Sequence, residues 1–194
     1  SFDFITAIAV PMSFGIMAIA KPFAPWFLGR QYDAAGTLMM FEAPVILFIA
    51  WSNVTGTQYL MPINRTKEYT VSVTLGAVVN IIANLFLIAL WGAKGATIAT
   101  DISELTVTAV QLYYIKNTIS RRKLFGNVWK YILSGAIMFI VVYRLALIIN
   151  MTVVNLVVEV IVGIIVYLLG IILLKAPIVN QAIKLIQKRR FEKR

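Results

Sequence analysis

Cysteine and histidine are both absent from the 194 residues of this chain. The absence of cysteine excludes disulfides, thiolate metal sites and cysteine nucleophiles, and the absence of histidine excludes imidazole proton relays. Carboxylates, hydroxyls and amides are the groups that remain for any chemistry. We therefore expect neither a metal site nor a cofactor.

Charged residues are also scarce, at 13% of the chain against 60% hydrophobic residues, and the mean hydropathy is +0.86. Soluble domains contain about a quarter charged residues, so the composition indicates an all-α integral membrane protein. Six apolar stretches are long enough to cross a bilayer and lie near 4–24, 38–61, 69–91, 95–116, 128–149 and 152–174. They predict one six-helix lobe over residues 1–176. The chain begins at Ser1 without an initiator methionine, and we expect it to be part of a longer protein.

The basic residues are unevenly distributed among the connections between these stretches. Fourteen of them lie after the second, fourth and sixth stretches, and only four lie elsewhere. This asymmetry predicts that both termini face the cytoplasm. The basic segment 177–194 reads as an amphipathic helix that lies on anionic inner-leaflet lipids. Nucleic acid is not an expected partner, because no soluble surface would present the charge.

Acidic residues number eight, and half of them fall inside the expected spans: Glu42, Asp101, Glu104 and Glu159. Carboxylates within a membrane are costly and normally face a protein interior or a watery cavity. At about 100° per residue, Asp101 and Glu104 share a stripe roughly 80° wide with three other polar residues, namely Thr97, Thr108 and Gln111. We interpret this stripe as the wall of a transport pathway, where two acids could share a proton or bind a cation.

Two further patterns each admit two interpretations. Gly76, Asn80 and Asn84 recur every four residues on the third stretch, which favours close helix packing with interhelical hydrogen bonds. The alternative is a polar lining opposite the acidic stripe. Arg144 and Glu159 flank the last turn at similar depth. A structural ion pair between them is favoured over a contact with cargo.

Several segments together resemble a known family. They are the segments 76–88 and 91–100 followed by Glu104, Pro11 with Gly15, and 27–35. Their order and spacing, from Pro11 to about Tyr114, resemble the C-terminal half of bacterial polysaccharide flippases. These are the oligosaccharide repeat-unit (Wzx-type) exporters of the multidrug/oligosaccharidyl-lipid/polysaccharide superfamily.

The resemblance implies a MATE-like transporter of about 12 to 14 helices in two lobes, of which this chain would be the second. Such proteins move undecaprenyl-diphosphate-linked oligosaccharides across the bacterial cytoplasmic membrane by alternating access, for surface polysaccharide assembly. Asn80, Asn84 and Glu104 occupy positions that match the family, whereas Asp101 cannot be matched. Other polysaccharide assembly proteins would be partners.

On this expectation the polar residues fall into three groups. The sugar would meet the amides of Asn53, Gln58, Asn80, Asn84 and Gln111. Ion coupling would use the carboxylates of Glu42, Asp101 and Glu104. The diphosphate would meet Lys21, Arg30 or Arg144, for which snorkelling to the interface is at least as good an explanation.

Two other functions compete with the flippase. A drug or cation antiporter of the same superfamily would have a similar fold and similar acidic sites, and it ranks second. A membrane polysaccharide polymerase or ligase ranks third, because the short outer connections leave no room for an acceptor-binding loop. We therefore expect a transporter and not an enzyme.

Overall fold

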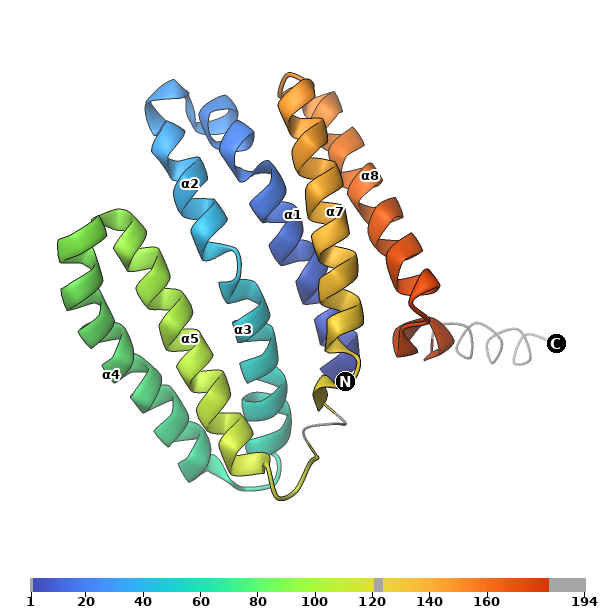
Figure 1. The fold of residues 1–194 in the computed structure, drawn as a ribbon. Coiled ribbons are helices and arrows are strands. Elements are labelled where there is room, and N and C mark those ends of the chain that lie inside the picture. The colour runs from blue at the N-terminus through green and yellow to red at the C-terminus, as the bar shows by residue number, and fades with distance from the viewer. Residues whose placement is uncertain (1, 121–123, 182–194) are drawn as a thin grey trace.

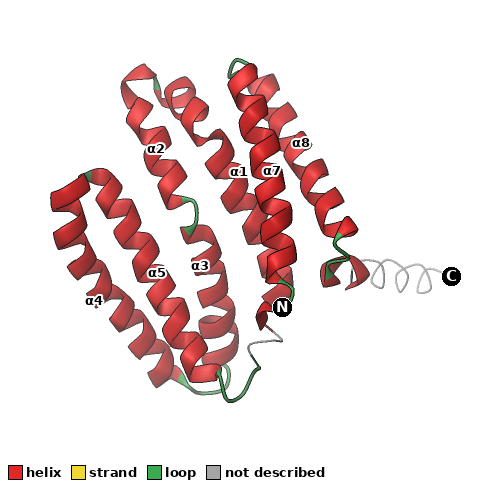
Figure 2. Cartoon of the chain, in the orientation of Figure 1, coloured by secondary structure: helices red, strands yellow, loops and turns green. Residues whose placement is uncertain are grey.

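The computed structural model describes residues 2–120 and 124–181, and every regular element in these ranges is helical. Figure 1 shows the helices side by side in a fan, in the spatial order α4, α5, α2 with α3, α1, α7 and α8. Figure 2 shows short connections between α1 and α2, α4 and α5, and α7 and α8, and a longer one between α5 and α7. The elements are α1 (Phe2–Leu28), η1 (Arg30–Tyr32), α2 (Asp33–Glu42), α3 (Val45–Ser52), η2 (Asn53–Leu60), α4 (Thr66–Trp91), α5 (Ala93–Ile115), α7 (Val128–Ile148) and α8 (Val153–Leu173).

Five helical segments are long and apolar enough to cross a membrane, where the sequence predicted six. They are Phe2–Leu28, Arg30–Leu60, Thr66–Trp91, Val128–Ile148 and Val153–Leu173. The sixth, α5, is not among them, because its acidic and hydroxyl side chains lower its hydropathy. It still runs antiparallel to α4 through the tight turn at Gly92, whose φ of 58° suits a residue without a side chain.

The second membrane segment is divided into three helical pieces. Helix α2 ends at Glu42 and α3 begins at Val45, because Pro44 has no amide hydrogen and cannot continue the helical ladder. The hydroxyl of Ser13 on α1 donates to the carbonyl of Ala43 at 2.9 Å. After Ser52 the chain continues as the π-helix η2. The break thus lies within the membrane segment, with a hydrogen bond from α1 to its backbone.

Small residues allow the helices to approach closely. A Cβ on Gly135 of α7 would lie 2.6 Å from Val10 Cγ1 on α1. A Cβ on Gly76 of α4 would collide with Val107 on α5, and Ser103 Oγ donates to the Gly76 carbonyl at 2.9 Å. This is the close packing that the sequence favoured for Gly76.

The connections fall at two ends of the fan. The start of α1, the connection from η2 to α4, the end of α5 and the end of α8 lie at one end (Figure 1). The connections from α1 to α2, α4 to α5 and α7 to α8 lie at the other. Five of the fourteen basic residues counted above belong to the described residues, and they lie at or next to helix ends on the first end: Arg65, Lys67, Lys116, Lys130 and Lys175. The tail helix expected at 177–194 falls mostly beyond residue 181, outside the described residues.

Candidate functional site

Helix α5, which carries the polar stripe, packs against α4, α3 and α2. Thr97, Thr108 and Gln111 are buried, and Asp101 and Glu104 are half-buried. The hydroxyl of Thr108 donates to the carbonyl of Phe48 on α3 at 3.0 Å. The stripe is therefore directed at neighbouring helices of the lobe, as expected for polar groups on a membrane helix.

An acidic residue marks the point where the second membrane segment breaks. Glu42, the last residue of α2, stands two positions before Pro44 and is exposed. Asp101 lies on α5, which packs against α2 and α3, and within the described ranges its Oδ1 is buried and has no hydrogen-bond partner. Neither acid is paired with a base, since the described residues contain a single ion pair, Arg65–Glu68. The break and the stripe therefore place two acids without a countercharge on helices that pack against each other.

Glu104 lies one helical turn from Asp101 but does not complete a metal site with the pair. Within residues 2–120 and 124–181, no three acidic side chains come close enough to hold a metal ion. Neighbouring carboxylates can instead share a proton or bind a monovalent cation, because each disfavours the charge of the other. Acids one helical turn apart, or on adjacent helices, are therefore candidates for reversible uptake of one positive charge.

The side-chain amide of Gln111 is hydrogen-bonded through both its oxygen and its nitrogen. Thr55 Oγ1 on η2 donates to Gln111 Oε1 at 2.6 Å, and Gln111 Nε2 donates to Ser72 Oγ on α4 at 3.2 Å. The Gln111 side chain is 1% exposed. It joins η2, α4 and α5, so its amide is not available to bind a sugar. Thr55 and Ser72 were missed from the sequence, where isolated hydroxyl residues carry no periodic signal.

The other amides lie on two separate elements. Asn53 and Gln58 are exposed on η2, and Asn53 Nδ2 donates to the Ile49 carbonyl at 3.0 Å. Asn80 and Asn84 are half-buried on α4, where Asn84 Nδ2 donates to the Asn80 carbonyl and to its Oδ1, both at 3.0 Å. The asparagines of α4 therefore bond to one another, and the structure places them on a different element from the η2 pair.

The ion pair expected between Arg144 and Glu159 is not formed, so this prediction was wrong. Arg144 is exposed on α7, whereas Glu159 on α8 is 1% exposed and borders a cavity shared with α1 and α7. Equal depth in an antiparallel pair does not fix the direction of a side chain around each helix axis. Lys21 and Arg30 are exposed beside the α1–α2 connection.

Comparison with known proteins gives one similarity to report. Over 90 residues, 46% of this chain, the sequence is 28% identical to the "Putative O-antigen transporter" of Escherichia coli (strain K12). The aligned residues span about a fifth of that relative, 22% of its length. No protein-family profile matches the chain, and no solved structure matches it.

Proposed function

We propose that this chain is one lobe of a membrane transporter that flips lipid-linked oligosaccharides across the bacterial cytoplasmic membrane. The observation that carries the proposal is Asp101, whose buried Oδ1 has no hydrogen-bond partner in the described part of the chain and which lies on α5, a helix that packs against α2, the helix that Glu42 ends. The similarity to a protein named as an O-antigen transporter supports the class of cargo. The lobe would comprise residues 1–176 with six spans, α5 included, and the basic segment 177–194 would lie on the inner leaflet.

In this proposal the acid pair couples transport to an ion gradient. With a proton or a monovalent cation bound, the repulsion between Glu42 and Asp101 disappears and α2 can approach α5. With the site empty, repulsion favours separation, and the break at Pro44 lets α2 tilt while α3 stays packed. One charge crossing 100 mV is worth about 2.3 kcal/mol, enough to bias a two-state cycle. Glu104, one helical turn from Asp101, would be a second binding site for the ion.

The cargo would be held by the polar groups that remain available. Asn80 and Asn84 on α4, with Asn53 and Gln58 on η2, offer amides to sugar hydroxyls. Lys21 on α1, Arg30 on η1 and Arg144 on α7 are cationic and exposed, toward the end of the fan that holds the α1–α2 and α7–α8 connections. They would meet the diphosphate as it reaches the outer leaflet, where a charged partner is worth more than in water.

Transport by the full-length protein in proteoliposomes tests this mechanism. We expect Asp101→Asn and Glu104→Gln each to lower the flipping rate of a lipid-linked oligosaccharide at least tenfold, because a neutral amide cannot bind and release a cation. Asp33→Asn removes the same charge from an exposed position at the start of α2 and should leave the rate unchanged. Normal transport by both site variants would remove these acids from the mechanism.

A drug or cation antiporter remains the second candidate, because acids without a basic partner would also bind a cationic cargo. The two functions differ in what deletion of the gene does to the cell. Loss of surface polysaccharide supports the flippase, whereas unchanged polysaccharide with raised sensitivity to cationic drugs supports the antiporter.

A further inference from the structure

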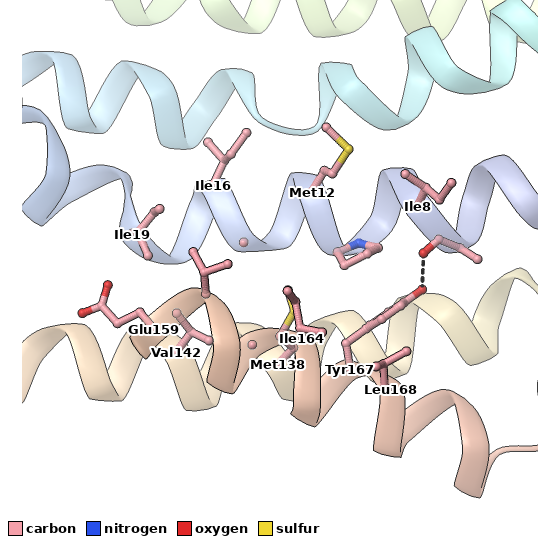
Figure 3. A pocket seen from close by; sticks show the side chains of 15 residues that line it. Ile8, Met12, Ile16, Ile19, Met138, Val142, Glu159, Ile164, Tyr167 and Leu168 are labelled. Carbon is pink, nitrogen blue, oxygen red and sulfur yellow. Dashed lines mark hydrogen bonds between the residues drawn. The ribbon is translucent and has the colours of Figure 1, made fainter. Parts of the chain in front are cut away.

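Two cavities lie outside the α5 stripe, and they differ in the polar groups that they offer to a ligand. The larger, of about 500 Å³, lies between α1 and α8, and Figure 3 shows mainly apolar side chains along it. The carboxylate of Glu159 points away from these side chains, and the hydroxyl of Tyr167 donates to the Ala7 carbonyl at 3.0 Å. This cavity therefore presents no polar group that would select an occupant.

The second cavity, of about 310 Å³, lies where α1 begins, beside η2 and the end of α5. Its lining combines polar side chains, Asp3 of α1 with Gln58 and Tyr59 of η2, and apolar ones that include Phe2 and Ile115. The two apolar residues are buried in one packed cluster, so that part of the wall is fixed. The cavity thus suits a ligand that is partly polar and partly apolar.

Asp3 supplies this cavity with a carboxylate whose hydrogen bonds are incomplete. The residue is half-buried, and within residues 2–120 and 124–181 its Oδ1 is buried without a hydrogen-bond partner. The single ion pair among these residues, Arg65–Glu68, does not involve it. A carboxylate in this state is costly unless a donor reaches it, and a cationic donor forms the stronger bond. The cavity therefore selects a group that has both a positive charge and N–H donors.

The length of α1 places the cavity at the level of lipid headgroups. At 1.5 Å per residue, the 27 residues of α1 extend over about 40 Å. The hydrocarbon core of a bilayer is about 30 Å thick, and the headgroup layers bring it to about 40–45 Å. Asp3 is in the first turn of α1, so it lies beyond the acyl chains. A lipid headgroup would meet the cavity at this depth.

We propose that this cavity binds the headgroup of a phospholipid that carries a primary ammonium, with the ammonium on Asp3 and the glycerol region against the apolar lining. An ammonium has three N–H donors, whereas the trimethylammonium of a choline lipid has none. A headgroup with a net negative charge would be repelled by Asp3, and a bare metal ion would leave the apolar lining without a partner. The site does not rest on the proposed flippase function.

Native mass spectrometry of the delipidated full-length protein, titrated with palmitoyl-oleoyl lipids, tests the site. We expect phosphatidylethanolamine to bind with a Kd at least fivefold lower than that of phosphatidylcholine, and Asp3→Asn to remove this preference. Asp33→Asn, the same loss of charge at an exposed position at the start of α2, should keep it. Glycerophosphoethanolamine, the same headgroup without acyl chains, should compete at least tenfold more weakly than the lipid.

A second variant changes the shape of the cavity and leaves its charge. Ile119 lines the cavity from the connection after α5 and is only half-buried, so Ile119→Trp should fill the space and abolish the preference with Asp3 intact. It decides the matter if Asp3→Asn does not fold. Equal affinity of the native protein for the two lipids, as when a basic side chain outside the described residues pairs with Asp3, would overturn the proposal. An unchanged preference in Asp3→Asn, or equally strong competition by the headgroup alone, would also overturn it.

Discussion

At the scale of single residues, polar groups within the lobe divide into those with partners and those without. Gln111, Thr55 and Ser72 satisfy one another between three helical elements. Asp101 Oδ1 and Glu159 Oε2 have no hydrogen-bond partner in the described part of the chain. In a membrane a satisfied group contributes to packing, whereas an unsatisfied one marks a site that another group must complete. The two kinds of residue therefore call for different tests.

Polar residues that have hydrogen-bond partners should contribute to the stability of the fold. We expect Gln111→Leu to lower the free energy of unfolding by about 1–2 kcal/mol, because it leaves the buried hydroxyls of Thr55 and Ser72 without their amide partner. Unfolding in a denaturing detergent, followed by circular dichroism, measures the change. Gln31→Leu, at an exposed glutamine of η1, is the matched control and should have little effect. Equal stability of both variants would show that the network contributes nothing.

At the scale of elements, the division of the second membrane segment is the feature with the clearest mechanical consequence. Pro44 interrupts the ladder, and Ser13 on α1 compensates by donating to the Ala43 carbonyl. Glu42 ends α2 at this point, and α2 packs against α5, the helix that carries Asp101. The break therefore places an exposed acid at the end of α2 and makes Pro44 a candidate hinge within the segment Arg30–Leu60.

Pro44→Ala tests whether the break serves transport. Alanine restores the missing amide hydrogen, so we expect α2 and α3 to join and the protein to become more stable, while the flipping rate falls several-fold. Thermal unfolding and proteoliposome flipping measure the two effects. Pro22→Ala is the control, because α1 continues through its own prolines. If Pro44→Ala transports at the native rate, the break is not a hinge.

At the scale of the whole molecule, the fan places its connections at two ends. The sequence places fourteen of its eighteen basic residues after the second, fourth and sixth apolar stretches, and the positive-inside rule predicts that these connections face the cytoplasm. On this prediction Lys21 and Arg30, beside the α1–α2 connection, lie at the outer end, where the proposed cargo would leave.

Labelling of introduced cysteines tests this orientation, and the chain itself contributes no cysteine background. In full-length protein without other cysteines, Thr118→Cys in the connection after α5 should react with a membrane-impermeant maleimide only after the cells are opened. Thr152→Cys in the α7–α8 turn should react in intact cells. The reversed pattern would invert the topology and remove the outer-leaflet role of Lys21 and Arg30.

The sequence by itself determined the helical membrane class, the places of the turns and the inward direction of the α5 stripe. These follow from hydropathy, from Gly and Pro signals and from the helical period, all of which act locally along the chain. Among the described residues, five helical segments are long and apolar enough to span a membrane. Helix α5 does not qualify, because the polar residues of its stripe lower its hydropathy.

Only the tertiary structure decided which polar groups meet. Glu42 ends α2, and α2 packs against α5, the helix of Asp101. Gln111 is hydrogen-bonded to Thr55 and Ser72, two hydroxyl residues that carry no sequence signal. Glu159 is buried on α8, whereas Arg144 is exposed on α7, so the two do not pair. Spacing along a helix fixes depth and face within that helix. The partner across the interface depends on how neighbouring helices are rotated and how closely they approach, and side chains distant in sequence set both.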